Sequence, residues 1–268
     1  NPSIGIYSAN GTNSTIYKTG KVKAGDMSIG IYGGNIDLDG TVPSETSAGA
    51  GGMAVYSKEG LVTIGENAKL SVGASLGKDK EGIAVYLAGS NQALDSRTSA
   101  LTIGDGSFGY VMTGQGNNVT TGYSGNTGVI TLGNDSIFLY SADKSTTGTI
   151  TNYNHLKSAG NENYGIYTSG RTVNHGNLDF SAGVGNVGIY SYVKGATATP
   201  GLVENYGEIR VSASDLTDPG NRKYGIGMAA GFTEEIPAGS GIKVLRGTGN
   251  IKNETSGVIK VKEGNSIG

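Results

Sequence analysis

The chain has 268 residues, of which 48 are glycine, 36% are hydrophobic and 16% are charged. Its net charge of −2 gives no basic footprint for nucleic acid and no polybasic segment for a lipid surface. Cysteine is absent, which excludes disulfides and thiolate metal sites, and no run approaches the ~20 apolar residues of a membrane helix. We therefore expect no nucleic-acid partner and no membrane insertion of this segment.

A four-residue phrase, Ile-Gly-Ile-Tyr at its first occurrence, returns throughout the chain. Its copies, the fifth of them degraded, lie at residues 4–7, 29–32, 53–56, 83–86, 108–111, 137–140, 164–167, 187–190 and 224–227. Most intervals are roughly 23 to 30 residues, a range typical of solenoid repeats. Neither end reads as the polar cap of a solenoid, so we expect residues 1–268 to be one segment cut from a longer repeat array.

Within each repeat, three short β-rich phrases are separated by Gly, Asn, Asp and Ser. One coil contains the phrases 148–151, 154–158 and 164–167, each with alternating apolar residues. No stretch has uninterrupted helical periodicity, so almost no helix is expected. The pattern predicts an all-β fold: a single-stranded, right-handed parallel β-helix of about nine to ten coils with three strands per coil. At ~4.8 Å per coil the rod would be roughly 40–50 Å long.

Alternation predicts which side chains enter the interior. In segments 207–211 and 257–261 the aliphatic residues at alternate positions should point inward and the charged residues should face water. In the second copy of the phrase, Ile29 and Ile31 should point inward together, which would leave Gly30 facing outward.

Stacked coils would place equivalent side chains in rows along the rod. The tyrosines of one such row are Tyr7, Tyr32, Tyr56, Tyr86, Tyr140, Tyr167 and Tyr190. This row could bind sugars or a partner, but stacking that holds the coils in register is the favoured interpretation. A second row, Asn152, Asn174, Asn205 and Asn253, is expected to bond amide to amide along the axis as a structural ladder.

Motifs that would carry chemistry are weak. The segment 104–109 has the letters of a dinucleotide fingerprint, but no helix pattern follows it to hold a pyrophosphate. His155 and His175 occupy what read as equivalent points of neighbouring coils, without a carboxylate placed to complete a metal site. The acidic residues are scattered rather than grouped as a polysaccharide-cleaving site would require. We expect no catalytic residues, no metal and no cofactor.

Interruptions of the period are better candidates for binding, because insertions into a solenoid form loops. They are residues 42–52, 89–99, 114–127, 195–201, 212–223 and 232–241. The loop 212–223 carries polar and charged side chains suited to contacts, although a purely solvated loop is the favoured interpretation. Its candidate binding residues are Asp215, Asp218, Asn221, Arg222 and Lys223.

Three segments, 28–32, 163–167 and 205–211, resemble the passenger repeats of large bacterial type V autotransporters, especially fusobacterial adhesins. The resemblance implies secretion to the bacterial surface, attachment to the outer membrane through a C-terminal barrel that this chain lacks, and a role in virulence. It also implies binding to a receptor or glycan on another bacterium or host cell. Gly227, where tyrosine is usual, departs from the pattern.

Three functions follow from these observations. The first is a non-enzymatic adhesin segment, a rigid rod whose loops and side-chain rows make contacts. The second is a passive spacer that holds a distal binding tip away from the membrane. The third, less favoured, is a β-helix polysaccharide lyase or hydrolase. No sequence feature identifies the receptor or the oligomeric state.

Overall fold

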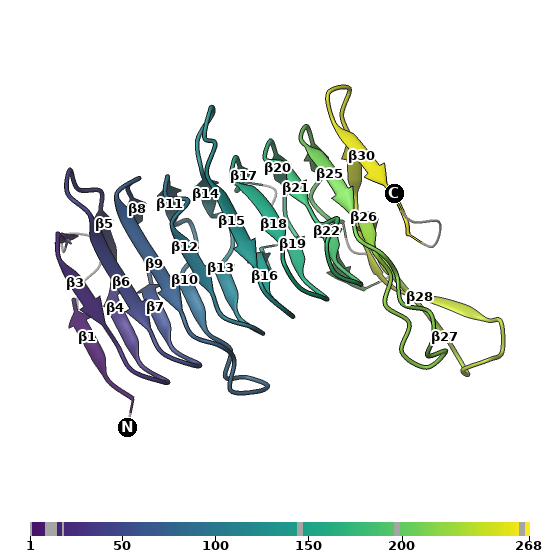
Figure 1. The fold of residues 1–268 in the computed structure, drawn as a ribbon, viewed down its shortest axis with the longest axis horizontal. Helices are drawn as coiled ribbons and strands as arrows, with labels where there is room; N and C mark the ends of the chain where they lie inside the picture. Colours follow the sequence, from purple (N-terminus) through teal and green to yellow (C-terminus); the bar gives the residue numbers. More distant parts are fainter. Residues whose placement is uncertain (1, 9–14, 18, 144–146, 196–198, 263–265) are drawn as a thin grey trace.

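The structure, a computed structural model, describes residues 2–8, 15–17, 19–143, 147–195, 199–262 and 266–268. The described part of the chain contains β strands and no helix, and its coils stack side by side with the two termini at opposite ends (Figure 1). Strands separated by one coil pair in parallel to form long sheets. The molecule is therefore a parallel β-helix, as the repeats predicted.

The first sheet is built from the copies of the repeated phrase and has nine strands in chain order. These are β1 (Ile4–Tyr7), β4 (Ile29–Gly33), β7 (Met53–Ser57), β10 (Ile83–Leu87), β13 (Phe108–Met112), β16 (Ile137–Ser141), β19 (Tyr164–Thr168), β22 (Val187–Ser191) and β26 (Ile226–Ala230). Equivalent residues pair, for example Tyr7 with Tyr32 and Tyr32 with Tyr56.

The second sheet also has nine strands, and the third face of the rod is made of two consecutive sheets. The second-sheet strands are β2 (Thr15–Tyr17), β5 (Asn35–Leu38), β8 (Leu61–Ile64), β11 (Ala93–Ser96), β14 (Asn118–Thr121), β17 (Ile150–Asn152), β20 (Thr172–Asn174), β24 (Val203–Asn205) and β29 (Ile251–Asn253). The third-face strands are β3 (Lys21–Lys23), β6 (Ser44–Ala48), β9 (Ala68–Val72), β12 (Leu101–Ile103), β15 (Val129–Leu132), β18 (His155–Ser158), β21 (Leu178–Asp179), β25 (Glu208–Val211) and β30 (Val258–Val261). Nine strands on each face correspond to nine coils.

The interior is a continuous column of aliphatic and aromatic side chains contributed by all three faces. Ile31, Val62, Leu139 and Ile209 are fully buried members of one hydrophobic cluster that runs along the rod. Burying a side chain of this size stabilises the fold by about 1.5–3 kcal/mol relative to leaving it in water. The strands are short, so stability comes from stacking coil on coil rather than from any single strand.

The first sheet does not follow strict alternation, and the expected orientations of Ile29 and Gly30 are wrong: Ile29 is half-exposed on the outer side, and Gly30 and Ile31 are buried. Ile29 pairs with Met53 and Ile31 pairs with Val55, but Gly30 is skipped in the ladder. Gly30 is buried, and a Cβ on it would lie 3.3 Å from the interior Thr46 Cγ2. A local irregularity at this position therefore turns two consecutive residues inward, as a bulge does.

Two further expectations change at the C-terminal coils. Ile259 packs against the core, but Val261 is 43% exposed because β30 is the edge strand of its sheet. Ile226 pairs with Val187 and Ala229 pairs with Tyr190, so Ala229, not Gly227, occupies the tyrosine position. The copy of the phrase is therefore residues 226–229, two residues later than alignment on Tyr224 indicated.

The asparagine row forms a hydrogen-bonded ladder that is buried at Asn152, Asn174 and Asn205 and exposed at Asn253. Asn152 Nδ2 donates to Asn174 Oδ1, Asn174 Nδ2 to Asn205 Oδ1, and Asn205 Nδ2 to Asn253 Oδ1, each at 2.8 Å. Asn174 Nδ2 also donates to the carbonyl of Gly176, two residues further along its own turn. The ladder satisfies corner carbonyls that a buried turn would otherwise leave without partners.

The interruptions of the period differ in kind. Residues 42–52, 89–99 and 114–127 contain the strands β6, β11 and β14, so they are parts of regular coils rather than insertions. By contrast, β27 (Phe232–Glu235) and β28 (Lys243–Thr248) form an antiparallel hairpin that pairs with β23 (Val193–Lys194). The hairpin projects from the last coils at the C-terminal end of the rod (Figure 1).

Candidate binding surfaces

The predicted tyrosines form two stacks on the outside of the first sheet. The ring centroids of Tyr7 and Tyr32 lie 5.3 Å apart, and those of Tyr32 and Tyr56 lie 4.9 Å apart, in stacked geometry. Tyr86 completes the first stack, edge-on to Tyr56 at 5.1 Å. Val111 then occupies the tyrosine position, so the row is interrupted between Tyr86 and Tyr140.

The second stack is denser. Tyr140 and Tyr167 lie 5.3 Å apart, Tyr167 and Tyr190 lie 5.0 Å apart, and Tyr164 and Tyr192 approach them from the side. Burial and the adjacent phenols raise the pKa of Tyr167 well above its usual value. Tyr167 and Tyr190 stack face to face, as do Tyr190 and Tyr192, and the ring faces in these contacts are closed to a sugar, which binds against an open ring face. The tyrosines thus hold neighbouring coils together and present mainly their edges to a partner.

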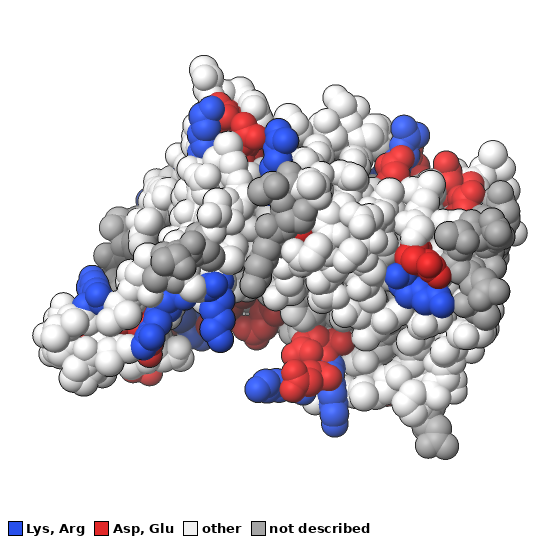
Figure 2. Space-filling view, turned by 180° about the vertical axis from the view of Figure 1, so that it is seen from behind, with Lys and Arg blue, Asp and Glu red and all other residues white. Residues whose placement is uncertain are grey.

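The strands of the first sheet contain no charged residue, so their outer surface is uncharged. The tyrosine row is one of two outward rows, and the second is also apolar. This second row consists of Ile4, Ile29, Met53, Ile83, Phe108, Ile137, Tyr164, Val187 and Ile226. Most members of both rows are partly exposed. We call the two rows together the tyrosine face. On the side of the molecule turned away in Figure 1, charged side chains gather in small separate groups (Figure 2).

The loop 212–223 lies along one side of the tyrosine face, and two of its predicted binding residues serve the loop itself. Asp215 accepts hydrogen bonds from the amide and hydroxyl of Thr217, at 3.0 and 2.6 Å. These bonds hold the pKa of Asp215 below its usual value. Asp218 accepts from the amide of Gly220 at 2.9 Å. Both carboxylates therefore shape turns.

The other three predicted residues, Asn221, Arg222 and Lys223, line a groove of about 470 Å³ beside the tyrosine face. Lys223 Nζ lies 2.8 Å from Glu162 Oε2 and fastens the loop to the turn before β19, two coils earlier. Burial, followed by the charge of Glu162, raises the pKa of Asp135 in the same groove, while Lys223 acts in the opposite direction. The structure therefore separates the five predicted residues into a turn-forming pair and a groove-lining group.

The β27–β28 hairpin lies at the opposite edge of the first sheet, where the chain passes from the first to the second sheet. The hydroxyl of Tyr190 donates to the Gly231 carbonyl at 3.0 Å and joins the tyrosine stack to the base of the hairpin. Phe232, Ile242 and Leu245 on the hairpin are 50%, 61% and 43% exposed. The hairpin thus adds apolar surface next to the tyrosine face.

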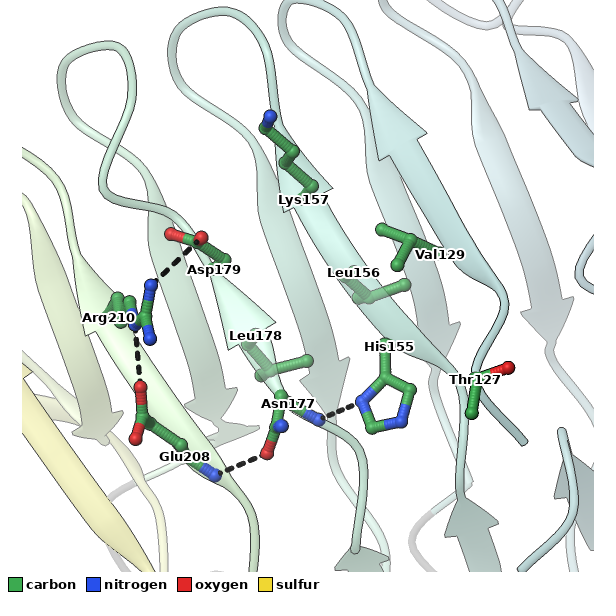
Figure 3. A pocket seen from close by; sticks show the side chains of 10 residues that line it. All are labelled: Thr127, Val129, His155, Leu156, Lys157, Asn177, Leu178, Asp179, Glu208 and Arg210. Carbon is green, nitrogen blue, oxygen red and sulfur yellow. Dashed lines mark hydrogen bonds and ion pairs between the residues drawn. The ribbon is translucent and has the colours of Figure 1, made fainter. Parts of the chain in front are cut away.

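A second hollow, which we call the third-face groove, lies on strands β15, β18, β21 and β25 and has a volume of about 340 Å³. Its outward residues include His155, Lys157, Asp179, Glu208 and Arg210 (Figure 3). Parallel pairing brings these together, because Lys157 is next to Asp179 and Asp179 is next to Arg210. The sequence interpretation that acids are scattered missed this cluster, which alignment of residues 157, 179 and 210 in successive coils would have revealed.

Ion pairs and hydrogen bonds occupy the groups of the third-face groove. Arg210 lies 2.6 Å from Glu208 and 3.5 Å from Asp179, and Lys260 lies 2.6 Å from Glu208. Hydrogen bonds from Lys260 and Arg210 lower the pKa of Glu208, and Glu208 raises the pKa of Arg210. Arg210, Asp179, Glu208 and Lys260 therefore compensate one another's charges.

The two histidines do not stack on each other, contrary to expectation. Asn152 pairs with Asn174, so His175 is equivalent to Tyr153 rather than to His155. Its ring stacks between Tyr153 and Tyr206, at 4.8 and 5.0 Å. His155 accepts from the Asn177 amide through Nδ1, and its Nε2 lies 2.9 Å from the Asn126 carbonyl. Each ring therefore contacts residues of the coils before and after its own.

Among the described residues, no group of three or more histidine, aspartate or glutamate side chains is arranged to hold a metal ion. The same part of the chain contains no helix long and apolar enough to cross a membrane. The chain matches no family model, no curated protein and no solved structure at a significant level.

Proposed function

We propose that this chain is a non-enzymatic adhesin segment on a bacterial surface, a rod whose tyrosine face contacts a receptor on another bacterium or host cell. The observation that supports this function is the absence of charge from two outward rows along nine coils. Extended apolar surface on a soluble protein is typical of contact sites, and tyrosine is enriched in protein interfaces. We take the partner to be a protein surface, because aliphatic and tyrosine side chains recur along both rows and stacking closes several of the ring faces that a sugar would use.

The two insertions add to the proposal. The loop 212–223 and the β27–β28 hairpin flank the last coils of the tyrosine face and would frame a partner on both sides. The salt bridge between Lys223 and Glu162 and the hydrogen bond from Tyr190 to Gly231 fix their positions. An interface with a preformed frame loses less conformational freedom on binding. The secretion route and outer-membrane attachment belong to the same proposal and rest on the resemblance of the repeats.

The passive spacer remains the second candidate, because the stacked tyrosines and the asparagine ladder account for coil-to-coil stability without any partner. The two candidates differ in whether the surface of the tyrosine face matters. A spacer requires only that the rod stays folded, whereas an adhesin requires uncharged contacts at specified positions.

The experiment coats beads with the chain and measures their attachment to bacterial and epithelial cells. Ile137→Lys places a charge within the tyrosine face, and Thr151→Lys places the same charge on the half-exposed outer side of the second sheet. We expect Ile137→Lys to reduce attachment about tenfold or more and Thr151→Lys to leave it unchanged. Circular dichroism checks that both variants keep the β-helix. Equal attachment by all three proteins would favour the spacer and contradict the proposal.

A further inference from the structure

The three faces of the rod differ in charge. The described third-face strands expose Lys21, Lys23, Lys69, Lys157, Arg210 and Lys260. The acids on this face are Glu45, Asp179 and Glu208, so six cations and three anions give it a net charge of +3. The chain as a whole has a net charge of −2. Cationic character is thus concentrated on one face of a slightly acidic molecule.

The second sheet has the opposite character. Its described strands expose Asp37, Asp95 and Glu204 against the single cation Lys252, a net charge of −2. The outward rows of the first sheet carry no charge. A long polyanion meeting this rod would therefore be attracted to the third face and repelled by its neighbour, which restricts where it can lie.

The cations of the third face are not all neutralised. Each acid lies between cations: Glu45 pairs with Lys21 at 3.0 Å, and Glu208 pairs with both Arg210 and Lys260 at 2.6 Å. Lys69 and Lys157 are exposed and make no ion pair with any described residue. An exposed ammonium group without a partner is available to an incoming anion without breaking an existing contact.

The surface is hollowed along the rod axis. A further hollow of about 610 Å³ adjoins the third-face groove, and the two share Val129. Its polar lining comprises Glu45, Lys69, Ser71, Ser99, Thr102 and Thr131. Hydroxyl groups therefore lie between the cationic positions and can bond to the hydroxyls of a ligand. The result is a trough that follows the stacking direction, in which equivalent side chains recur about every 4.8 Å.

We infer that the third face binds an acidic polysaccharide laid along the trough, with its carboxylate or sulfate groups at Lys69, Lys157 and the cations near Arg210. A linear polymer with a regularly repeated anion suits a surface with regularly repeated positions. Nucleic acid is a poorer fit, because single-strand binding uses aromatic rings open to bases. Among the described residues that line the trough, His155 has the only aromatic ring, and both of its nitrogens are bonded within the protein. This inference uses residues distinct from the tyrosine face and does not depend on the proposed adhesive contact.

The experiment measures binding of the whole chain to four immobilised polymers: polygalacturonate, heparin, dextran and single-stranded DNA. The double variant Lys69→Ser with Lys157→Ser removes two exposed cations of the trough. The matched control, Lys194→Ser with Lys243→Ser, removes two exposed cations from the sheet that contains the hairpin. Neither pair contributes to the core, so both proteins should fold.

We expect binding to polygalacturonate, heparin or both, weakening as salt is raised, and no retention on dextran. The trough variant should bind about tenfold more weakly, while the control stays within about twofold of the original chain. Preference between the two acidic polymers identifies whether carboxylate or sulfate is favoured, and either result supports the inference. Failure to bind both polymers, equal loss in the two variants, equal binding to dextran, or tighter binding to DNA would overturn it.

Discussion

Replacing Asn174 with alanine tests whether the buried amide ladder stabilises the coils. Asn174 is fully buried. It accepts a hydrogen bond from Asn152 and donates to Asn205, both at 2.8 Å, and it also donates to the carbonyl of Gly176 at 2.9 Å. Alanine removes all three hydrogen bonds, so the Asn152 amide nitrogen, the Asn205 amide oxygen and the Gly176 carbonyl each lose a partner.

The magnitude follows from this count of bonds. A net contribution of about 0.5–1.5 kcal/mol for each of three bonds gives about 1.5–4.5 kcal/mol, and the stranded buried groups place the expectation in the upper half of that range. We therefore expect Asn174→Ala to lower the free energy of unfolding by about 3–4 kcal/mol. Asn174→Thr should be milder, because Thr121 occupies the equivalent position two coils earlier and its hydroxyl bonds to Asn152 at 2.9 Å.

Asn253 supplies the matched control. It belongs to the same ladder, accepts from Asn205 and donates to the Gly257 carbonyl, both at 2.8 Å, but it is exposed, so water can replace the lost partners. Asn253→Ala should therefore lower the free energy of unfolding by about 1 kcal/mol or less. Urea denaturation followed by circular dichroism gives the global values. Amide hydrogen exchange shows whether the loss centres on the coils around β20, as nearest-neighbour stacking predicts.

A stabilising role for the ladder is contradicted if Asn174→Ala is no more destabilising than Asn253→Ala. A local role is contradicted if the exchange rates rise uniformly along the rod. In the first case the ladder would be a consequence of stacking rather than a cause of its stability. In the second, the coils would unfold as a single unit and a local hydrogen-bond argument would not apply.

Three further predictions concern rings and close approaches. Burial raises the pKa of Tyr110 to about 12. The unfolded chain should lose this proton first, near pH 10, so the free energy of unfolding should fall between about pH 10 and pH 12. Tyr110→Phe should reduce that fall by about 2–3 kcal/mol, as measured by urea denaturation across this pH range. Tyr167→Phe should be nearly neutral because it keeps the stack, whereas Tyr167→Ala should lower the urea-derived free energy of unfolding by about 2 kcal/mol. A Cβ on Gly188 would lie 2.5 Å from the Gly227 carbonyl oxygen of the next coil, so Gly188→Val should be destabilising by about 1–3 kcal/mol and should lower the thermal midpoint. A Cβ on Gly25 would have no atom within 4 Å, so Gly25→Val should change the thermal midpoint little.

The sequence predicted the architecture because the repeated phrase and its spacing report directly on stacking. Each copy became a strand of one sheet, and alternation correctly assigned interior residues such as Ile209. Alternation failed at Gly30, because a backbone irregularity turns consecutive residues inward and leaves no mark in the apolar pattern. It also misplaced Gly227, because the preceding loop shifts the register by two residues.

The candidate surfaces were less accessible to sequence reasoning. Asp179 and Arg210 are 31 residues apart and become neighbours only through the pairing of β21 with β25. Loops of different length separate the strands, so counting residues does not bring these positions into line. The hairpin could not be distinguished from a disordered loop, because its strands pair with each other and with β23 rather than with the repeat. Functional surface on a solenoid thus depends on register, which is encoded more weakly than the core.

The position of the β27–β28 hairpin has a consequence for how such a rod can be modified. Between β26 and β29 the chain leaves the coil and returns, yet Val203 still pairs with Ile251 and Asn205 with Asn253 across the excursion. Extra polypeptide at this turn therefore grows sideways and adds nothing to the axial rise. Foreign sequences grafted there should leave the distances between sites elsewhere on the rod unchanged, which makes this turn a suitable place for a reporter or an epitope.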